Sequence, residues 1–417
     1  MQSSVLVVGG GISGMTAAIE AAECGRQVYL VEKEAYLGGR VSKMNKYFPK
    51  LCPPLCGLEI NFRRLRVNPL VTVMTGSKVE KVTGASGDFT AVIKTAPRYV
   101  NEKCVACDDC VKVCPVNRPD DFNYNMSETK AVYLPHAMAM PAKYVIDMSV
   151  CKGEACSECV KACKYGAIEL NMEEKTTTVK VAAVVYATGW KPYDAGKIEN
   201  LGYGQIKNVI NNVEMERLSA VNGPTGGKIV RQDNAEPVKK VAFVQCAGSR
   251  DENHLPYCSS ICCLASIKQA NYVRDQYPES EVSIFYIDLR APGKYEAFYK
   301  KMEKDKNVKF IKGKVARIEQ DESGRATVTV EDILGGGKLK ESFDLVVLAT
   351  GMEPTMKTDK AVDVVLNDDG FMELDRQTVD GFIPAGVASG PVDVTTSIQN
   401  STGAALRAFQ CGVGKRG

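Results

Sequence analysis

A glycine fingerprint between a short strand and a helix is the feature that most narrows the fold. Ser4–Val8 is a β-branched run, and Met15–Ala22 has the composition of a helix. Gly9, Gly11 and Gly14 stand at the junction. In this context the first glycine permits a tight turn, the second lets the backbone approach a pyrophosphate, and the third allows close helix–strand packing. The sequence therefore predicts a dinucleotide-binding βαβ unit at the N-terminus.

An acidic residue completes this unit. The apolar run Gln27–Val31 ends at Glu32, close to the offset of roughly 20 residues at which an acid accepts hydrogen bonds from ribose hydroxyls. The N-terminus of the intervening helix offers unpaired N–H groups and a positive dipole end to the phosphates. Strand, fingerprint, helix, strand and acid occur in order, which favours a bound dinucleotide over a glycine-rich turn that binds nothing.

Composition excludes several classes of protein. The chain has 417 residues, 45% of them hydrophobic and 25% charged, with a formal net charge of +3. This balance is typical of a soluble globular protein and gives no basic field for nucleic acid. The longest largely apolar stretch, Val179–Ala187, contains Lys180 and is shorter than the ~20 residues that span a bilayer. No secretory signal is visible, so the sixteen cysteines are expected to be reduced and to serve as ligands or redox groups.

The first cysteine run has the spacing of a bacterial ferredoxin. Cys104, Cys107 and Cys110 follow at two-residue intervals, and Cys114 comes after three more residues, directly before Pro115. This pattern is typical of [4Fe–4S] ligation, whereas structural zinc favours two separated C-x2-C pairs.

A second run, from Cys151 to Cys163, departs from that ideal by two extra residues after its first cysteine and by Lys164 in place of proline. The crossed ligation of two-cluster ferredoxins then predicts two [4Fe–4S] clusters. Their expected ligand sets are Cys104, Cys107, Cys110 and Cys163 for one cluster, and Cys114, Cys151, Cys156 and Cys159 for the other.

A third cysteine group follows what resembles a second nucleotide-binding strand, Val241–Gln245. Its members are Cys246, Cys258, Cys262 and Cys263. Only Gly248 remains of a glycine fingerprint here, so binding of a nicotinamide dinucleotide is not expected. The spacing alone leaves free buried thiols open as an alternative to cluster ligands. Adjacent cysteines cannot both face one ligand from a helix interior, but they can at a loop–helix junction.

Two further cysteines, Cys52 and Cys56, are open to three interpretations: a redox dithiol, additional cluster ligands, or inert thiols. A C-x3-C pair is not the usual spacing of a redox-active dithiol.

Several segments resemble the flavoproteins with two dinucleotide-binding domains, the thioredoxin and glutathione reductase type. They are Leu37–Arg40, the repeated A-T-G-x-x-P of Ala187–Pro192 and Ala349–Pro354, and the closing segment Gly381–Val387. Val387 stands where that family usually has an aspartate. The resemblance implies an α/β fold and FAD at the N-terminal site. The residues expected to bind it are Gly9, Gly11, Gly14, Glu32, Gly38, Gly39, Arg40, Thr188, Gly189 and Gly386.

The predicted organisation is a flavoprotein with an inserted two-cluster ferredoxin domain. The expected boundaries are 1–97 for the first part of the FAD domain, 98–173 for the ferredoxin-like insertion, 174–200 for the FAD domain continued, 201–350 for a degenerate nucleotide-binding-like domain, and 351–417 for the C-terminal part of the FAD domain.

The match extends beyond generic flavoproteins to the HdrA-type flavoprotein component of heterodisulfide reductase. The segments that resemble it are Tyr133–Pro141, Ala187–Asp194, Gly223–Val230 and Gln245–Asp251. The resemblance implies a third [4Fe–4S] cluster on the Cys246 group, and an oxidoreductase component that transfers electrons without NAD(P)H.

Those heterodisulfide reductase components usually carry additional N- and C-terminal domains. The short form resembles the corresponding flavoprotein of the quinone-interacting membrane-bound oxidoreductase complexes of sulfate reducers. This implies a cytoplasmic protein held at the membrane by two partner subunits, one with iron–sulfur and flavin groups and one in the membrane that reacts with quinone. The chain would then link the menaquinone pool to adenylylsulfate reductase, with no nucleic acid partner. The alternative hypothesis is a self-contained NAD(P)H-dependent disulfide reductase that uses Cys52 and Cys56.

Overall fold

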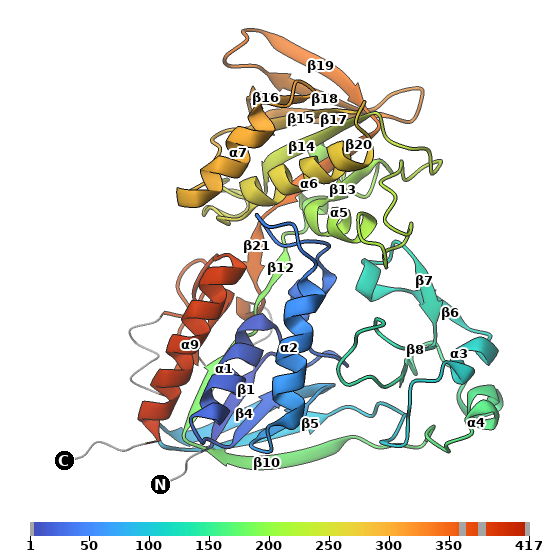
Figure 1. Ribbon diagram of the computed structural model, residues 1–417, viewed down its shortest axis with the longest axis vertical. Helices are drawn as coiled ribbons and strands as arrows, with labels where there is room; N and C mark the ends of the chain where they lie inside the picture. The colour runs from blue at the N-terminus through green and yellow to red at the C-terminus, as the bar shows by residue number, and fades with distance from the viewer. Residues whose placement is uncertain (1–3, 358–363, 374–380, 413–417) are drawn as a thin grey trace.

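The computed structural model describes residues 4–357, 364–373 and 381–412. A five-stranded parallel sheet, in the order β22-β11-β1-β2-β3, forms the centre of the lower unit in Figure 1. Its strands are β1 (Val5–Val8), β2 (Val28–Val31), β3 (Val71–Met74), β11 (Ala183–Tyr186) and β22 (Phe382–Pro384). Strands from the beginning, middle and end of the described chain therefore pair in one sheet.

Two layers cover this sheet. Three helices pack on one face: α1 (Ile12–Glu23), α2 (Pro54–Val67) and α9 (Val394–Cys411). On the other face lies an antiparallel sheet of β4 (Ser77–Ala85), β5 (Asp88–Thr95) and β10 (Lys175–Val181). Phe89 and Ile93 of β5 are buried against Leu6 and Val184 of the parallel sheet. The result is a three-layer arrangement whose apolar strands are covered on both faces.

A single strand over residues 177–187 is what the sequence pattern predicts, and the structure has two strands there instead. β10 ends at Val181 and pairs antiparallel with β5, whereas β11 begins at Ala183 and pairs parallel with β1. The N–H group of Ala182 donates to the carbonyl oxygen of Ser4, 2.7 Å away. The chain therefore passes from one sheet to the other at Ala182, inside the apolar stretch Val181–Ala187, and no polar residue or turn signal marks the change.

The upper unit is built on a second parallel sheet, in the order β13-β20-β14-β15-β16. Its strands are β13 (Val209–Asn211), β14 (Lys240–Ala247), β15 (Glu281–Tyr286), β16 (Val308–Lys312) and β20 (Leu345–Thr350). One face packs against helices α5 (Asn212–Leu218), α6 (Cys262–Gln276) and α7 (Glu296–Glu303), and the other against the antiparallel sheet β17 (Val315–Gln320), β18 (Ala326–Glu331) and β19 (Lys338–Phe343). The triple glycine at residues 335–337 lies in the turn between β18 and β19.

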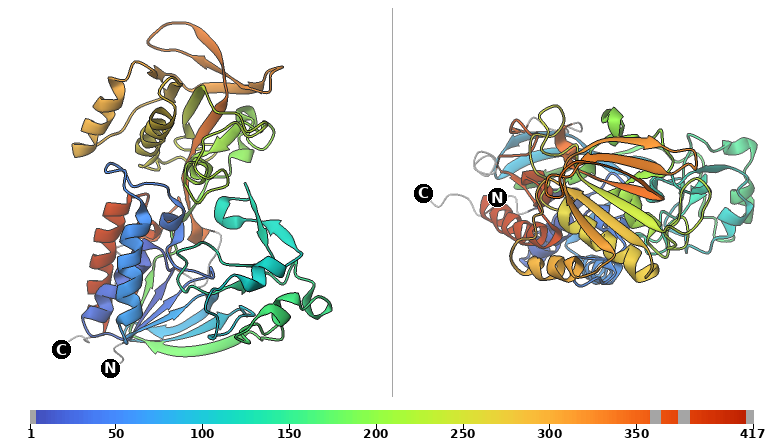
Figure 2. Two further views of the ribbon diagram at one scale, coloured as in Figure 1. Left: turned by 45° about the vertical axis from the view of Figure 1, so that its right-hand side comes forward. Right: turned by 90° about the horizontal axis from the view of Figure 1, so that it is seen from above.

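A two-stranded ribbon of β12 (Trp190–Pro192) and β21 (Met352–Pro354) joins the two units, as Figures 1 and 2 show. Each strand is formed by the last three residues of one copy of the repeated A-T-G-x-x-P segment. A second connection is the segment before α2. Lys268 of α6 donates to the carbonyl oxygen of Lys46 at 2.8 Å and forms an ion pair with Glu216 at 2.9 Å, with side-chain exposures of 3% and 8%.

The cysteine-rich insertion forms the flank of the lower unit in Figure 1. Its elements are short: α3 (Asp109–Val113), α4 (Glu158–Ala162), β6 (Asn117–Pro119), β7 (Glu128–Lys130), β8 (Val132–Tyr133) and β9 (Val145–Ile146). Its small apolar core includes Val100, Val132, Tyr144 and Ile168.

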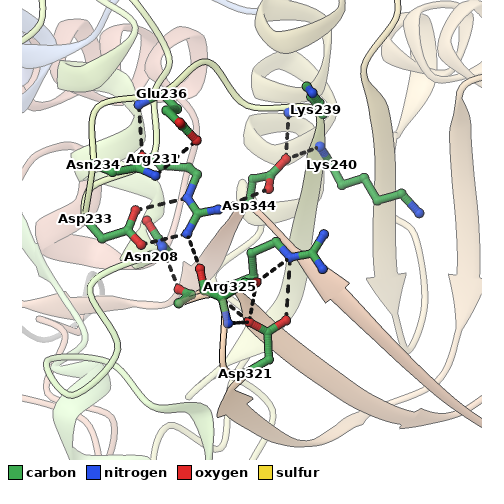
Figure 3. Close-up of polar contacts among 12 residues, drawn as sticks. Asn208, Arg231, Asp233, Asn234, Glu236, Lys239, Lys240, Asp321, Arg325 and Asp344 are labelled. Atoms are coloured by element: carbon green, nitrogen blue, oxygen red, sulfur yellow. Dashed lines mark hydrogen bonds and ion pairs between the residues drawn. The ribbon is translucent and has the colours of Figure 1, made fainter.

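A polar network at the N-terminal ends of β14 and β20 anchors the antiparallel sheet of the upper unit (Figure 3). Arg231 forms an ion pair with Asp233 at 2.7 Å and donates to the carbonyl oxygen of Ser323. Asp344 accepts the backbone N–H groups of Lys239 and Lys240 at 2.8 and 2.9 Å. This network therefore has a structural role, and it lies at the strand ends opposite to those where ligands bind in open α/β sheets.

Candidate functional site

The turn between β1 and α1 requires glycine at two positions for packing. Gly9 has a φ of +107°, and a Cβ on it would lie 2.3 Å from the carbonyl oxygen of Ala187. A Cβ on Gly14 would lie 1.7 Å from the carbonyl oxygen of Gly9. The close approach of helix to strand therefore depends on both residues.

Gly11 has a different role. It caps the N-terminus of α1 with an extended backbone, and the nearest atom to a Cβ there is the Cα of Gly39, 3.9 Å away. Gly38 and Gly39, both with positive φ, bring the following loop against Gly11 through a β-bridge. Open space thus lies over the helix N-terminus, where a pyrophosphate can approach the unpaired N–H groups.

Glu32 closes one side of this cradle. Its carboxylate accepts the backbone N–H groups of Gly10 at 2.6 Å and of Glu34 at 2.8 Å, and its side chain is buried. Burial raises the pKa of Glu32 above its usual value, although the two backbone hydrogen bonds act in the opposite direction. A buried carboxylate at the end of β2 is the acceptor that a ribose hydroxyl needs.

The other residues predicted to bind FAD come to the same region. The buried hydroxyl of Thr188 has no hydrogen-bond partner, and Gly189 next to it has a φ of +69° with open space at its Cβ position. A Cβ on Gly386 would lie 2.0 Å from the Oγ of Ser13, so this glycine packs against the start of α1. Arg40 donates to the carbonyl oxygen of Trp190 at 2.8 Å. An orphaned polar group and an open glycine cradle are features that FAD would fit.

The environments of two residues in this region, Val387 and Lys43, are not apparent from the sequence. Val387, at the position of the family's aspartate, is buried in an apolar cluster with Met352 and Phe371. Lys43 is largely buried, and burial together with the neighbouring Arg40 lowers its pKa to about 8.

His136 lies at the contact between the insertion and the loop after β2. It is 7% exposed, stacks on Phe122 at 4.7 Å, and has no hydrogen-bond partner on either nitrogen. Burial, with Arg217 and Lys43 nearby, lowers its pKa to about 4. Sequence reasoning missed these groups because residues 43, 136 and 217 meet only in the folded chain.

In the insertion, one predicted ligand set lines a common pocket. The sulfur-bearing residues around this pocket of about 330 Å³ are Cys114, Cys151, Cys156 and Cys159. The cysteine that ends the first run therefore lies with three cysteines of the second, as crossed ligation requires. Left-handed backbone at Ser157 helps the second run to curl around the pocket.

Of the other predicted set, Cys104, Cys107 and Cys110 lie close together. Cys110 is buried at the start of α3, and burial together with the neighbouring Cys104 raises its thiol pKa to about 12; Cys107 is close enough to contribute. The sulfur of Cys163 accepts the N–H group of Ala167 at 3.3 Å.

The third cysteine group lines a separate pocket of about 310 Å³ in the upper unit. Cys246 lies in a bulge of β14 with a φ of +57°, and Cys262 and Cys263 are the first two residues of α6. The sulfur of Cys258 accepts the N–H group of Ser260 at 3.4 Å. All four thiols therefore face one space at the C-terminal end of β14. The expectation of a loop–helix junction for the adjacent pair is correct.

Burial raises the pKa of Cys262 most strongly, with the thiols of Cys263 and Cys246 adding to the shift, and it raises the pKa of Cys246 and Cys263 as well. Within the described ranges, no three His, Cys, Asp or Glu side chains converge closely enough for a single metal ion. The thiols surround their pockets and do not meet at one point.

Cys52 and Cys56 lie apart from these pockets. Both are exposed; Cys52 precedes α2 and Cys56 belongs to its first turn. In the part of the chain that the structure describes, no helix has the length and apolar character to cross a bilayer.

Comparison with known proteins supports this interpretation of the geometry. The FAD-dependent oxidoreductase family model matches residues 4–189. The chain is 35% identical, over 98% of its length, to the HdrA-type component of the H(2):CoB-CoM heterodisulfide,ferredoxin reductase of Methanothermobacter thermautotrophicus, of which it covers 64%. It is 38% identical, over 97% of its length, to the corresponding iron–sulfur component of the CoB--CoM heterodisulfide reductase of Methanocaldococcus jannaschii, again covering 64% of that protein.

Among solved structures, the thioredoxin reductase of T. acidophilum superposes with a TM-score of 0.55 at 15% identity, covering 99% of each chain. The predicted α/β fold of a thioredoxin reductase-like flavoprotein is therefore confirmed. The chain spans about two-thirds or less of the length of the curated relatives it matches.

Proposed function

We propose that this chain is an FAD- and iron–sulfur-containing electron-transfer component of a heterodisulfide reductase-like complex. The observation that carries the proposal is the assembly of cysteines from distant segments around two pockets of a flavoprotein fold. An ordinary flavoprotein disulfide reductase needs one dithiol and has no use for eight cysteines gathered around two pockets. Relatives named as components of heterodisulfide reductases support the same interpretation.

The proposed cofactors are one FAD and three [4Fe–4S] clusters. FAD would be held by the cradle around Gly11 and Glu32, two clusters by the insertion, and the third by the Cys246 group. FAD exchanges electrons in pairs or singly, whereas each cluster carries one electron, so the chain would join two-electron and one-electron chemistry. The domain boundaries given above are part of this proposal.

We also propose a specific physiological setting for this electron transfer. Electrons would pass between the menaquinone pool and adenylylsulfate reductase in dissimilatory sulfate reduction, with the chain in the cytoplasm and held at the membrane by a quinone-reactive partner. Support for this setting is the resemblance of the chain to the flavoprotein of quinone-interacting complexes.

The alternative, an NAD(P)H-dependent disulfide reductase that uses Cys52 and Cys56, is not favoured. In place of a second glycine fingerprint, the C-terminal bulge of β14 holds Cys246, and Gly248 after it is packed against the ring of Tyr193. Anaerobic mixing with NADH and with NADPH tests this point. We expect no rapid bleaching of the flavin, and rapid bleaching by either nucleotide would favour the alternative.

Cofactor analysis tests the main proposal. Anaerobically purified protein should contain one FAD and about twelve iron atoms per chain, from three clusters of four. Cys258→Ala should lower the iron by about four and leave the flavin in place. Cys24→Ala is the matched control, since Cys24 is exposed at the end of α1 and outside all three groups. Stoichiometric zinc without iron, or full iron in Cys258→Ala, would contradict the proposal.

A further inference from the structure

Charged side chains adjoin the thiols of the Cys246 pocket. Arg250, Asp288 and Arg290 line it together with the four cysteines. Arg250 lines the same pocket as Cys246, and its side chain is 25% exposed. A cation therefore lies partly shielded from water beside one of the proposed ligands.

Arg250 is held in this position from two sides. Its Nη2 atom forms an ion pair with Asp288 Oδ2 at 2.9 Å, and Arg250 itself has a left-handed backbone with a φ of +58°. The backbone carbonyl oxygen of Asp288 also accepts a hydrogen bond from the thiol of Cys263 at 3.6 Å. Asp288 thus links the arginine to a second thiol of the same pocket.

The pocket in the insertion has a different electrostatic environment. The charged residue that lines this pocket is Lys152, whose side chain is exposed to solvent. Water screens such a charge far more than one held against a partly buried thiol. The two pockets therefore differ in how strongly a fixed cation acts on their sulfurs.

Reduction of a [4Fe–4S] cluster by one electron, from the 2+ to the 1+ state, adds negative charge without making a bond or moving a proton. A fixed cation stabilises the reduced state, and net charge and hydrogen bonds to sulfur are the terms by which a protein sets cluster potentials. We infer that Arg250, held by Asp288, is a positioning residue that raises the reduction potential of a cluster on the Cys246 group. This inference rests on the third cluster proposed above.

Potentiometric titration of the full chain, followed by electron paramagnetic resonance, tests the inference. The signal that disappears in Cys258→Ala identifies the cluster. Arg250→Gln should lower the midpoint potential of this cluster by at least about 59 mV, which corresponds to a tenfold change in the one-electron equilibrium constant. Asp288→Asn should shift the potential upward, because it leaves the charge of Arg250 uncompensated, and Arg250→Lys should retain most of the wild-type value.

Lys152→Gln is the matched control, since it removes a cation at the other pocket and should leave this signal unchanged. Unaltered potentials in both Arg250→Gln and Asp288→Asn, at about twelve iron atoms per chain, would overturn the inference. If Arg250→Gln loses iron, the midpoint potential of Asp288→Asn becomes the test. An upward shift supports the inference, and an unchanged potential refutes it. A wild-type content of about eight iron atoms would instead refute the third cluster itself.

Discussion

Gly11 offers a way to remove flavin binding while the protein fold stays intact. Its backbone is extended (φ −74°, ψ −174°), a conformation open to any residue, and a Cβ there would lie no closer than 3.9 Å to the protein. Gly11→Val therefore places its methyl groups in the open space over the start of α1. The extended backbone suits valine, although glycine is the better residue at a helix N-cap, so the stability of the cofactor-free chain should change little.

The expected loss of affinity follows from the groups that the valine would cover. A pyrophosphate at this helix terminus accepts hydrogen bonds from backbone N–H groups, and hydrogen bonds to charged groups contribute about 1.5–3 kcal/mol each. Loss of two of them corresponds to about 3–6 kcal/mol, or roughly a 10²- to 10⁴-fold weaker binding of FAD. The purified variant should therefore contain little flavin.

Flavin per chain after anaerobic purification, and titration of the cofactor-free protein with FAD, measure this effect. Gly403→Val is the matched control, because Gly403 lies on α9 with open space at its Cβ position and away from the cradle. Gly14→Ala should behave in the opposite way, destabilising the fold itself, since its Cβ would lie 1.7 Å from a carbonyl oxygen. Full flavin content in Gly11→Val, with unchanged thermal unfolding, would show that the pyrophosphate does not approach this residue.

Three further outcomes are expected. Cys107→Ala should remove about four iron atoms per chain and leave the flavin bound, which iron and flavin analysis would check; unchanged iron would refute the ligand assignment. Because burial lowers the pKa of His136 from 6.5 to about 4, its contribution to stability is present above pH 6.5 and is lost as the pH falls toward 4, by about 1 kcal/mol for each pH unit in that window. The urea midpoint of His136→Phe should lack this dependence on pH. Glu216→Leu leaves the Lys268 ammonium buried without its carboxylate and should cost about 3–5 kcal/mol by denaturant titration, whereas Glu296→Gln, at an exposed pair, should be nearly neutral.

Local patterns were sufficient for the elements that carry the chemistry. The strand–glycine–helix–acid order predicted β1, α1 and β2 with small errors at their ends, because the turn that it describes is made by neighbouring residues. Resemblance to two-domain flavoproteins predicted the fold class. Cysteine spacing likewise proposed the crossed sets of the insertion, and the structure brings Cys114 to the second run as that pattern demands.

Only the tertiary structure decided features that depend on distant segments. The passage of the chain between two sheets at Ala182 is not visible in the sequence, since the residues on both sides of it are apolar and no turn residue separates the two strands. The low pKa of His136 arises from packing against residues of other segments. The Arg250–Asp288 pair beside Cys246 joins the ends of two parallel strands that are 38 residues apart in sequence. Spacing encodes ligands that one loop can present, whereas burial and charge at a site are set by whichever segments the fold packs around it.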